Sequence, residues 1–191
     1  MTRLILMGAP GSGKGTQGDL LAQELGIPRL APGDIFRSAI KAGTDLGKQV
    51  KAYSDAGILV PDELVVAVMA ERLGQSDAQT GWILDGFPRT IPQAEALETL
   101  LKNLNQRCDR IINLTVPTQI LLQRLKQRAM EQNRADDTEE VIHKRLEEYH
   151  AKTLPLLEFY GDRIAHIDGT MAVAAVTTAI KQAIGIVALN T

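Results

Sequence analysis

A glycine-rich segment close to the start of the chain limits most strongly what this protein can fold into. Residues 8–16 read GAPGSGKGT and directly follow the apolar run LILM at residues 4–7, so a buried strand leads into a loop and then into a helix. Glycines let such a loop turn successive backbone N–H groups toward an anion, and the N-terminal end of the helix adds positive polarity. Lys14 supplies a full charge at the same place. The segment therefore predicts a cradle for the phosphates of a nucleotide.

The spacing of this segment is close to the general phosphate-loop pattern G-x-x-x-x-G-K-[ST] but differs from it at one step. Gly15 follows Lys14, and the hydroxyl group arrives one residue later, on Thr16. An ordinary turn between a strand and a helix needs one or two glycines and has no use for a lysine. A purely structural turn therefore does not account for the segment.

Apolar runs alternate with helical patterns along the rest of the chain, as in a parallel sheet with helices on both faces. We expect strands at residues 4–7, 27–30, 82–84, 110–115 and 164–167, and helices at 13–25, 92–104 and 117–128. Asp137 is predicted to be the N-cap of a further long helix that Pro155 interrupts. The alanine-rich stretch 171–189 predicts a packing helix, and residues 31–62 predict a helical excursion without a strand. The fold class is α/β, a P-loop three-layer fold with a central parallel five-stranded sheet.

Composition and charge limit the kind of ligand and the cellular compartment. The 191 residues, 45% hydrophobic and 23% charged, suffice for one domain with a substantial core. With 21 Lys and Arg against 23 Asp and Glu, the chain is not built to hold a nucleic acid. A single cysteine, Cys108, excludes an internal disulfide, and no apolar run reaches the roughly 18 residues of a membrane span. We expect a cytoplasmic protein with a small-molecule ligand and no membrane partner.

A second group of polar residues follows the strand at 82–84. Asp85 ends this strand, where a carboxylate next to a phosphate loop orders Mg²⁺ through water. Arg89, four residues later, carries a planar two-pronged donor for a phosphate. Further positive charge comes from Arg37, Arg124, Arg128, Arg134 and Arg145. Transfer of a phosphoryl group between two anionic reactants needs such charge compensation, whereas the three histidines lack any acidic or nucleophilic companion and are interpreted as structural.

Seven short motifs extend over nearly the whole chain. They read GAPGSGKGTQ, PGDIFR, GILVPDELV, LDGFPRT, NRADD, HKRLEEY and IDGT. On these residues the chain resembles the adenylate kinases of the short-lid type, and LDGFPRT together with the GKGT loop is typical of nucleoside monophosphate kinases. The resemblance implies reversible transfer of the terminal phosphoryl group of MgATP to AMP, giving two ADP, in purine nucleotide and energy homeostasis. It also implies a core (residues 1–30, 61–126 and 138–191), an inserted helical NMP-binding segment (31–60) and a short lid (127–137).

The resemblance implies a role for each matched position on the ATP side. The ATP phosphates would be held by Gly11, Ser12, Gly13, Lys14, Gly15 and Thr16. Within that set Lys14 would follow the transferred group. Arg128 would bind an ATP phosphate, Arg124 would pack against the adenine, and the backbone near Met171 would complete the adenine pocket.

Another set of matched positions belongs to the acceptor. The AMP side would consist of Pro32, Arg37, Ile58, Leu59, Val60, Gly86, Phe87, Pro88, Arg89 and Gln93. Arg134 and Arg145 would clamp phosphates across both substrates, and Asp136 and Asp137 resemble lid residues that close over the site. The residues with catalytic roles would be Lys14, Arg89, Arg128, Arg134 and Arg145.

The lid that the resemblance implies is short. Only five residues, 129–133, separate Arg128 from Arg134, whereas long-lid members place a small domain there, sometimes with cysteine-bound zinc. Zinc is therefore not expected, and Mg²⁺ enters with ATP. The resemblance also implies a monomer that works on ATP, AMP and ADP.

One position departs from the family pattern. Pro32 stands where the family usually has a threonine that helps to recognise AMP, and proline offers neither a hydroxyl nor an N–H group. UMP/CMP kinases also lack that threonine, but they typically carry asparagine where this chain has Thr90 and Gln93. The Gln93 amide suits the donor and acceptor pair of adenine, so AMP is the expected acceptor and a pyrimidine monophosphate kinase is the alternative.

A nucleotide-dependent switch is a second alternative, from a different class of protein. GTP switches carry an Asn-Lys-x-Asp guanine reader and an Asp-x-x-Gly switch motif, and this chain has neither. A switch also gives no reason for a second phosphate-binding set at Arg37 and Arg89. The sequence favours an enzyme.

Overall fold

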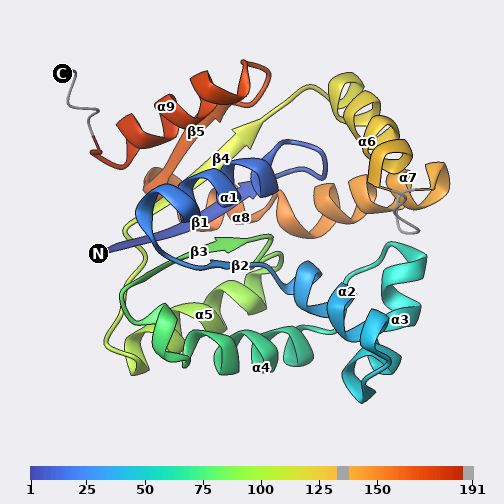
Figure 1. Cartoon of the computed structure of the whole chain (residues 1–191), viewed down its shortest axis with the longest axis horizontal. Coiled ribbons are helices and arrows are strands. Elements are labelled where there is room, and N and C mark those ends of the chain that lie inside the picture. The colour runs from blue at the N-terminus through green and yellow to red at the C-terminus, as the bar shows by residue number, and fades with distance from the viewer. Residues whose placement is uncertain (133–137, 187–191) are drawn as a thin grey trace.

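Five strands form one parallel sheet in the order β2–β3–β1–β4–β5 (Figure 1). The computed structural model of the protein describes residues 1–132 and 138–186. The strands are β1 (Thr2–Gly8), β2 (Arg29–Leu30), β3 (Gly81–Asp85), β4 (Arg110–Thr115) and β5 (Ile164–Asp168). The predicted α/β fold with a central parallel sheet is confirmed. The edge strand β2 is shorter than the predicted 27–30, because Pro28 has no N–H to donate to a ladder.

Helices connect the strands and cover both faces of the sheet. The helices are α1 (Lys14–Leu25), α2 (Pro32–Ala42), α3 (Asp45–Ala56), α4 (Asp62–Leu73), α5 (Ile91–Asn103), α6 (Thr118–Gln132), α7 (Glu139–Glu148), α8 (Leu156–Tyr160) and α9 (Val173–Ala183). Short 3₁₀ turns lie at Ser76–Ala78 and Gly161–Arg163, and a wider π-type turn at Tyr149–Thr153. The carboxyl ends of the strands all point toward the side of the molecule on which α2, α3, α6 and α7 lie (Figure 1).

Two hydrophobic clusters lie on opposite faces of the sheet. Alternate residues of β1 face the two clusters: Leu4 and Leu6 belong to one cluster, and Ile5 and Met7 belong to the other. Helices α1 and α9 cover the first face, and α4, α5 and α8 cover the second. All four of these β1 side chains are at most 4% exposed. A strand buried on both faces explains why the sequence shows a continuous apolar run there.

Several helix boundaries differ from the expectation; α6 runs to Gln132 and not to residue 128, and three further differences have a local cause. The N-cap of α7 is Thr138, whose hydroxyl accepts from the Val141 N–H at 3.4 Å, whereas the predicted cap Asp137 lies outside the described residues. The chain leaves the α-helix at Tyr149, six residues before Pro155, because a proline clashes with the preceding turn and the backbone widens to avoid it. Helix α9 ends at Ala183 and does not extend through the predicted stretch to residue 189, since Gly185 has a φ of +76° that breaks the helix.

The excursion between β2 and α4 consists of α2 and α3. These helices cross so closely that a Cβ on Gly47 would lie 2.2 Å from the Ala39 carbonyl oxygen, so only glycine fits at the crossing. Thr44 caps α3 by accepting from the Gly47 N–H at 3.1 Å. The pair lies at the carboxyl edge of the sheet, beside α7 (Figure 1).

Among the residues that the structure describes, no helix combines the length and the apolar character needed to cross a membrane.

Candidate active site

A cavity of about 830 Å³ opens at the carboxyl edge of the sheet. Its walls come from the loop after β1, from α2 and α3, from the loop after β3, and from α6, α7 and the start of α9. Strand β1 lies between β3 and β4; the chain runs from β1 to β2 on one side of it, and from β3 to β4 on the other side. In open α/β sheets this crevice is where ligands bind.

The loop between β1 and α1 packs against the neighbouring strand. Gly8 has a φ of +137°, and a Cβ there would lie 2.7 Å from both the Leu114 carbonyl oxygen and the Ser12 hydroxyl. Only glycine combines that backbone conformation with so close an approach. The loop therefore stays tight against β4 and lines the cavity at the start of α1.

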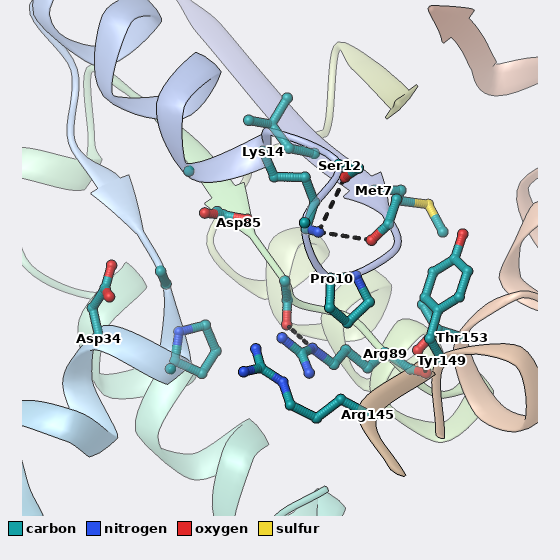
Figure 2. Close-up of a pocket in the computed structure, with 18 of the residues that line it drawn as sticks. Met7, Pro10, Ser12, Lys14, Asp34, Asp85, Arg89, Arg145, Tyr149 and Thr153 are labelled. Carbon is teal, nitrogen blue, oxygen red and sulfur yellow. Dashed lines mark hydrogen bonds between the residues drawn. The ribbon is translucent and has the colours of Figure 1, made fainter. Parts of the chain in front are cut away.

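Lys14 is the first residue of α1 and its side chain curls back over the loop (Figure 2). Its ammonium group donates to the carbonyl oxygens of Gly8 at 2.7 Å and Ala9 at 2.9 Å, and lies 3.5 Å from the Ser12 hydroxyl. Burial lowers the pKa of Lys14 to about 8; nearby arginines add to the shift, and the carboxylate of Asp85 opposes it. Burial makes the charged form of Lys14 less favourable in free energy, and an anionic ligand would offset this effect.

For the phosphoryl transfer that the sequence motifs imply, this pKa predicts how the rate depends on pH. The free enzyme loses the Lys14 proton as the pH rises through about 8, and a neutral amine no longer attracts phosphate, so kcat/KM for MgATP should fall above that pH. A bound phosphate favours the charged form and raises the pKa, so kcat should fall only at a higher pH. Steady-state rates between pH 7 and pH 10.5 measure both profiles. In the Lys14→Arg variant, residue 14 does not titrate in this pH range, so the fall in kcat/KM at alkaline pH should vanish. If the fall persists, another group causes it.

Asp85 stands at the carboxyl end of β3, beside the phosphate loop. Its Oδ2 accepts from Arg29 Nη1 at 2.5 Å, and a Cβ on Gly15 would lie 3.8 Å from the same oxygen. Mg²⁺ keeps several of its waters and takes one or two carboxylates together with substrate phosphates, so one carboxylate at this place fits the ion. The residues present suit a magnesium ion held through water by Asp85 and by the phosphates of a nucleotide.

Arg89 is fixed on the opposite wall of the cavity. Its Nε donates to the Gly86 carbonyl oxygen at 3.0 Å, and its own carbonyl oxygen accepts from the Thr153 hydroxyl at 3.0 Å. Burial, together with the charge of Arg37, lowers the pKa of Arg89, although a carboxylate, Asp85, counteracts this. An arginine still keeps its charge at neutral pH. The guanidinium therefore faces the cavity as an oriented cation (Figure 2).

The amide of Gln93 is held in one orientation. Its Oε1 accepts from the Arg89 N–H at 2.7 Å, and its Nε2 donates to Asp62 Oδ1 at 2.7 Å. Thr90, the N-cap of α5, donates to the other oxygen of Asp62 at 2.8 Å. An amide has two donor hydrogens and two lone pairs, so one of each is left for a ligand. The network thus fixes which end of the amide offers a donor and which an acceptor.

Gln17, in the first turns of α1, positions the start of α9. Its Nε2 donates to the Val173 carbonyl oxygen at 2.9 Å, and its Oε1 accepts from the Thr177 hydroxyl at 2.7 Å. These bonds hold the segment that carries Met171, whose side chain is 37% exposed, against the phosphate loop. The position predicted for the adenine pocket is thereby tied to the position predicted for the phosphates.

The structure brings nearly all the predicted site residues to this one cavity. Those that line it are Gly11, Ser12, Gly13, Lys14, Gly15, Thr16, Pro32, Arg37, Ile58, Leu59, Val60, Asp85, Gly86, Pro88, Arg89, Gln93, Arg124, Arg128, Arg145 and Met171. Phe87 does not line it, because its side chain is 1% exposed and packs in the core. Arg134, Asp136 and Asp137 lie outside the described residues. His143, His150 and His166 are exposed side chains away from the cavity.

The cavity also contains residues that the sequence interpretation missed. Arg29 is the first residue of β2 and contacts three carboxylates. The signal that singled out Asp85, a place at the carboxyl end of a strand, does not apply to Arg29, which begins its strand. Glu148 accepts from the Leu59 N–H at 3.4 Å and pairs with Lys152 at 2.8 Å, and no sequence pattern marks it among the charged residues of α7.

In the described parts of the chain, no group of three or more His, Cys, Asp or Glu side chains is arranged to hold a metal ion. The fit to magnesium therefore depends on Asp85 acting together with the phosphates of a substrate.

Comparison with known proteins agrees with this geometry. The sequence pattern of the family described as adenylate kinase matches residues 6–165, which is most of the chain. The chain belongs to the adenylate kinase family. An adenylate kinase of a Cyanothece species is 56% identical over 183 residues, covering 95% of this chain and 94% of that protein. An adenylate kinase of Leptospira biflexa is 46% identical, covering 96% and 100%, and adenylate kinase 1 of a Nostoc species is 47% identical, covering 97% and 100%.

Membership of the adenylate kinase family makes the chain an ATP:AMP phosphotransferase. The five-stranded parallel sheet is consistent with the P-loop fold of that family.

Proposed function

We propose that the cavity binds MgATP and AMP together and that the terminal phosphoryl group passes directly between them, in either direction. The observation that carries this proposal is that two separate sets of cationic side chains line one cavity, and we assign a phosphate to each of them. The loop with Lys14 forms one of them, and Arg37 with Arg89 forms the other. A protein that only bound or hydrolysed ATP would need the first group alone.

The cations of the site act on one another. The charges of Arg89, Arg145 and Arg128 all disfavour the charged form of Lys14. Arg89 and Arg145 point into the same part of the cavity (Figure 2). Cations held this close repel one another until a polyanion arrives, and they are already in place to stabilise the charge that spreads over the transferred group. We assign Lys14 to the transferred phosphoryl group, Arg89 to the AMP phosphate, and Arg145 and Arg128 to phosphates between the nucleotides.

The remaining assignments follow the matched motifs. We propose that Arg124 packs against the adenine of ATP, that the backbone at Met171 completes that pocket, and that Arg134 joins Arg145 across the two substrates. Mg²⁺ bound with ATP offsets phosphate charge, and Asp85 would hold that ion through water.

Two segments are proposed to close over the substrates. Residues 31–60, which carry α2 and α3, form the acceptor segment, and residues 127–137 form the lid. Closure would expel water, which could otherwise accept the phosphoryl group in place of AMP. The rest of the chain, residues 1–30, 61–126 and 138–191, would form the core that stays in place.

We propose AMP as the acceptor because the hydrogen bonds of Gln93 fix the orientation of its side-chain amide. The hydrogen and the lone pair left on that amide match the ring nitrogen and the amino group of adenine. Pro32 is buried, begins α2 and lines the cavity, so it supplies shape but no hydrogen bond. One missing hydroxyl costs only about 1 kcal/mol, which the amide contact outweighs.

Initial rates of ADP formation with MgATP and AMP, CMP, UMP or GMP test this proposal. A strong preference for AMP is the expected result. Preference for CMP or UMP would establish the pyrimidine alternative, and no transfer to any acceptor would favour a nucleotide-binding module.

The Pro32→Thr variant is expected to prefer AMP over CMP more strongly than the native chain does. Threonine at this position restores a hydroxyl beside the base, worth roughly a factor of five to ten in selectivity. The measurement is the ratio of kcat/KM for AMP to that for CMP in both proteins. Pro61→Thr, at the exposed N-cap of α4, serves as the matched proline control. An unchanged ratio in Pro32→Thr would show that this position does not read the base.

We further propose that the enzyme works as a monomer in the cytoplasm. Both phosphate-binding groups come from one chain, so a second copy is not needed to complete the cavity. ATP, AMP and ADP are metabolites of that compartment.

A further inference from the structure

Arg29 lies at the centre of a cluster of carboxylates beside the acceptor half of the cavity. Its Nε pairs with Asp19 at 2.7 Å, its Nη2 with Asp34 at 2.5 Å, and its Nη1 with Asp85 at 2.5 Å. Asp19 belongs to α1, Asp34 to α2, and Asp85 to the end of β3. One guanidinium thus joins the helix of the phosphate loop, the sheet and the acceptor segment.

Asp34 extends this cluster to Arg37. Its Oδ2 accepts from Arg29, and its Oδ1 accepts from Arg37 Nη2. With both oxygens occupied, the carboxylate is held between two guanidinium groups and cannot rotate without losing one of them. The position of Arg37 therefore depends, through Asp34, on Arg29.

Helix α1 is shaped to admit the Arg29 side chain. A Cβ on Gly18 would lie 2.5 Å from Arg29 Cδ, so any larger residue would push the arginine away. The Arg29 side chain is 18% exposed, and the Asp85 side chain 11%. A side chain given this space inside the fold is part of the site and not a flexible surface arginine.

The charges around Arg29 also indicate that this residue is part of the site. Without Arg29, three carboxylates beside the acceptor half of the cavity would lose the guanidinium that pairs with all of them, and Asp34 would keep its ion pair with Arg37. A carboxylate that lost Arg29 would hold Arg37 more strongly and would repel the incoming phosphate dianion. Burial disfavours the Arg29 cation, but Asp85, Asp34 and Asp19 raise its pKa, so the charge is permanent.

We propose that Arg29 is a positioning residue for the acceptor nucleotide: through Asp34 it orients Arg37 toward the phosphate of AMP, and it offsets the carboxylates that would repel that phosphate. The proposal rests on the function proposed above, in which Arg37 binds the acceptor phosphate. It distinguishes the two nucleotides, because the carboxylates that pair with Arg29, those of Asp19, Asp34 and Asp85, lie outside the loop at residues 8–16 that holds ATP phosphates.

The first test measures binding in the Arg29→Gln variant by calorimetry, with AMP and with ATP in separate titrations and without magnesium. We expect the affinity for AMP to fall about tenfold, equivalent to about 1.4 kcal/mol, and the affinity for ATP to change by less than about twofold. Arg72→Gln is the matched control, because Arg72 is also a largely buried guanidinium, at 23% side-chain exposure, and makes a double contact with Asp77 far from the cavity. The control should leave both affinities unchanged.

The second test asks whether the effect passes through Asp34. Arg29→Gln, Asp34→Asn and the double variant form a cycle in which the AMP affinities should be non-additive, the double variant losing clearly less than the product of the single losses. Arg29→Lys keeps the charge without the fork, so it should recover part of the AMP affinity and also serve if the glutamine variant folds poorly. Far-ultraviolet circular dichroism confirms the fold of each variant.

The outcomes separate the two proposals. If the native chain fails to transfer phosphate to AMP, the proposed function fails, whatever Arg29 does. If native transfer is normal and Arg29→Gln lowers only the stability, or weakens AMP and ATP equally, Arg29 is a structural residue and the inference is overturned. Additive effects in the cycle would also overturn it, since Arg29 would then act without Asp34.

Discussion

Replacing Lys14 with methionine is expected to lower kcat by about 10²-fold to 10³-fold, the loss found when one preorganised charged donor is removed from a reaction centre. Methionine has nearly the same length and shape as lysine but no charge, so the variant removes the cation and keeps the packing. Burial lowers the pKa of Lys14 to about 8, which means that the fold already holds this charge at a cost. The variant should therefore unfold at the same or a higher denaturant concentration than the native chain.

The measurement combines kcat at saturating MgATP and AMP with a denaturant unfolding curve. Lys102→Met, at the exposed end of α5, is the matched control and should keep native kcat. A Lys14→Met enzyme with native kcat would show that the lysine does not stabilise the transferred group. A loss of kcat together with a large loss of stability would instead trace the effect to the fold of the loop.

Replacing Arg89 with alanine is the second change with a large expected effect. The guanidinium is oriented by the Gly86 carbonyl oxygen, and its burial, which lowers the pKa of Arg89, means that water does not replace the lost cation. We expect kcat/KM for AMP to fall by about 10²-fold to 10³-fold. The KM for MgATP should change far less, because the phosphate loop stays intact.

Steady-state kinetics with each nucleotide varied in turn measures this split. Arg89→Lys should recover only part of the loss, because a lysine keeps the charge but lacks the planar two-pronged donor. Arg107→Ala is the control, since Arg107 is 89% exposed and pairs only loosely with Asp109 at 3.9 Å. Equal losses for both nucleotides in Arg89→Ala would place this arginine between the substrates and not on the AMP phosphate.

The features that the sequence predicted correctly depend on local patterns. The sheet follows from continuous apolar runs, since a strand buried on both faces needs apolar residues on both. The phosphate loop follows from glycine spacing, because the backbone conformation at Gly8 and the approach of Leu114 admit no side chain. Helix ends were predicted less well, because Thr138 competes with its neighbour for the N-cap and the backbone had to avoid Pro155 several residues early.

The sequence by itself determined the α/β class, the phosphate loop with Lys14 and the likeness to a family, because each of these lies within a short run of residues whose chemistry needs no distant partner. Only the tertiary structure decided how the site is held. Arg29 meets carboxylates of three separate elements, and Gln93 takes its orientation from Asp62, 31 positions before it in the chain. Phe87, in the middle of a nucleotide motif, packs into the core. Such contacts depend on how strands and helices pack across the sheet, and no spacing within a single segment contains that information.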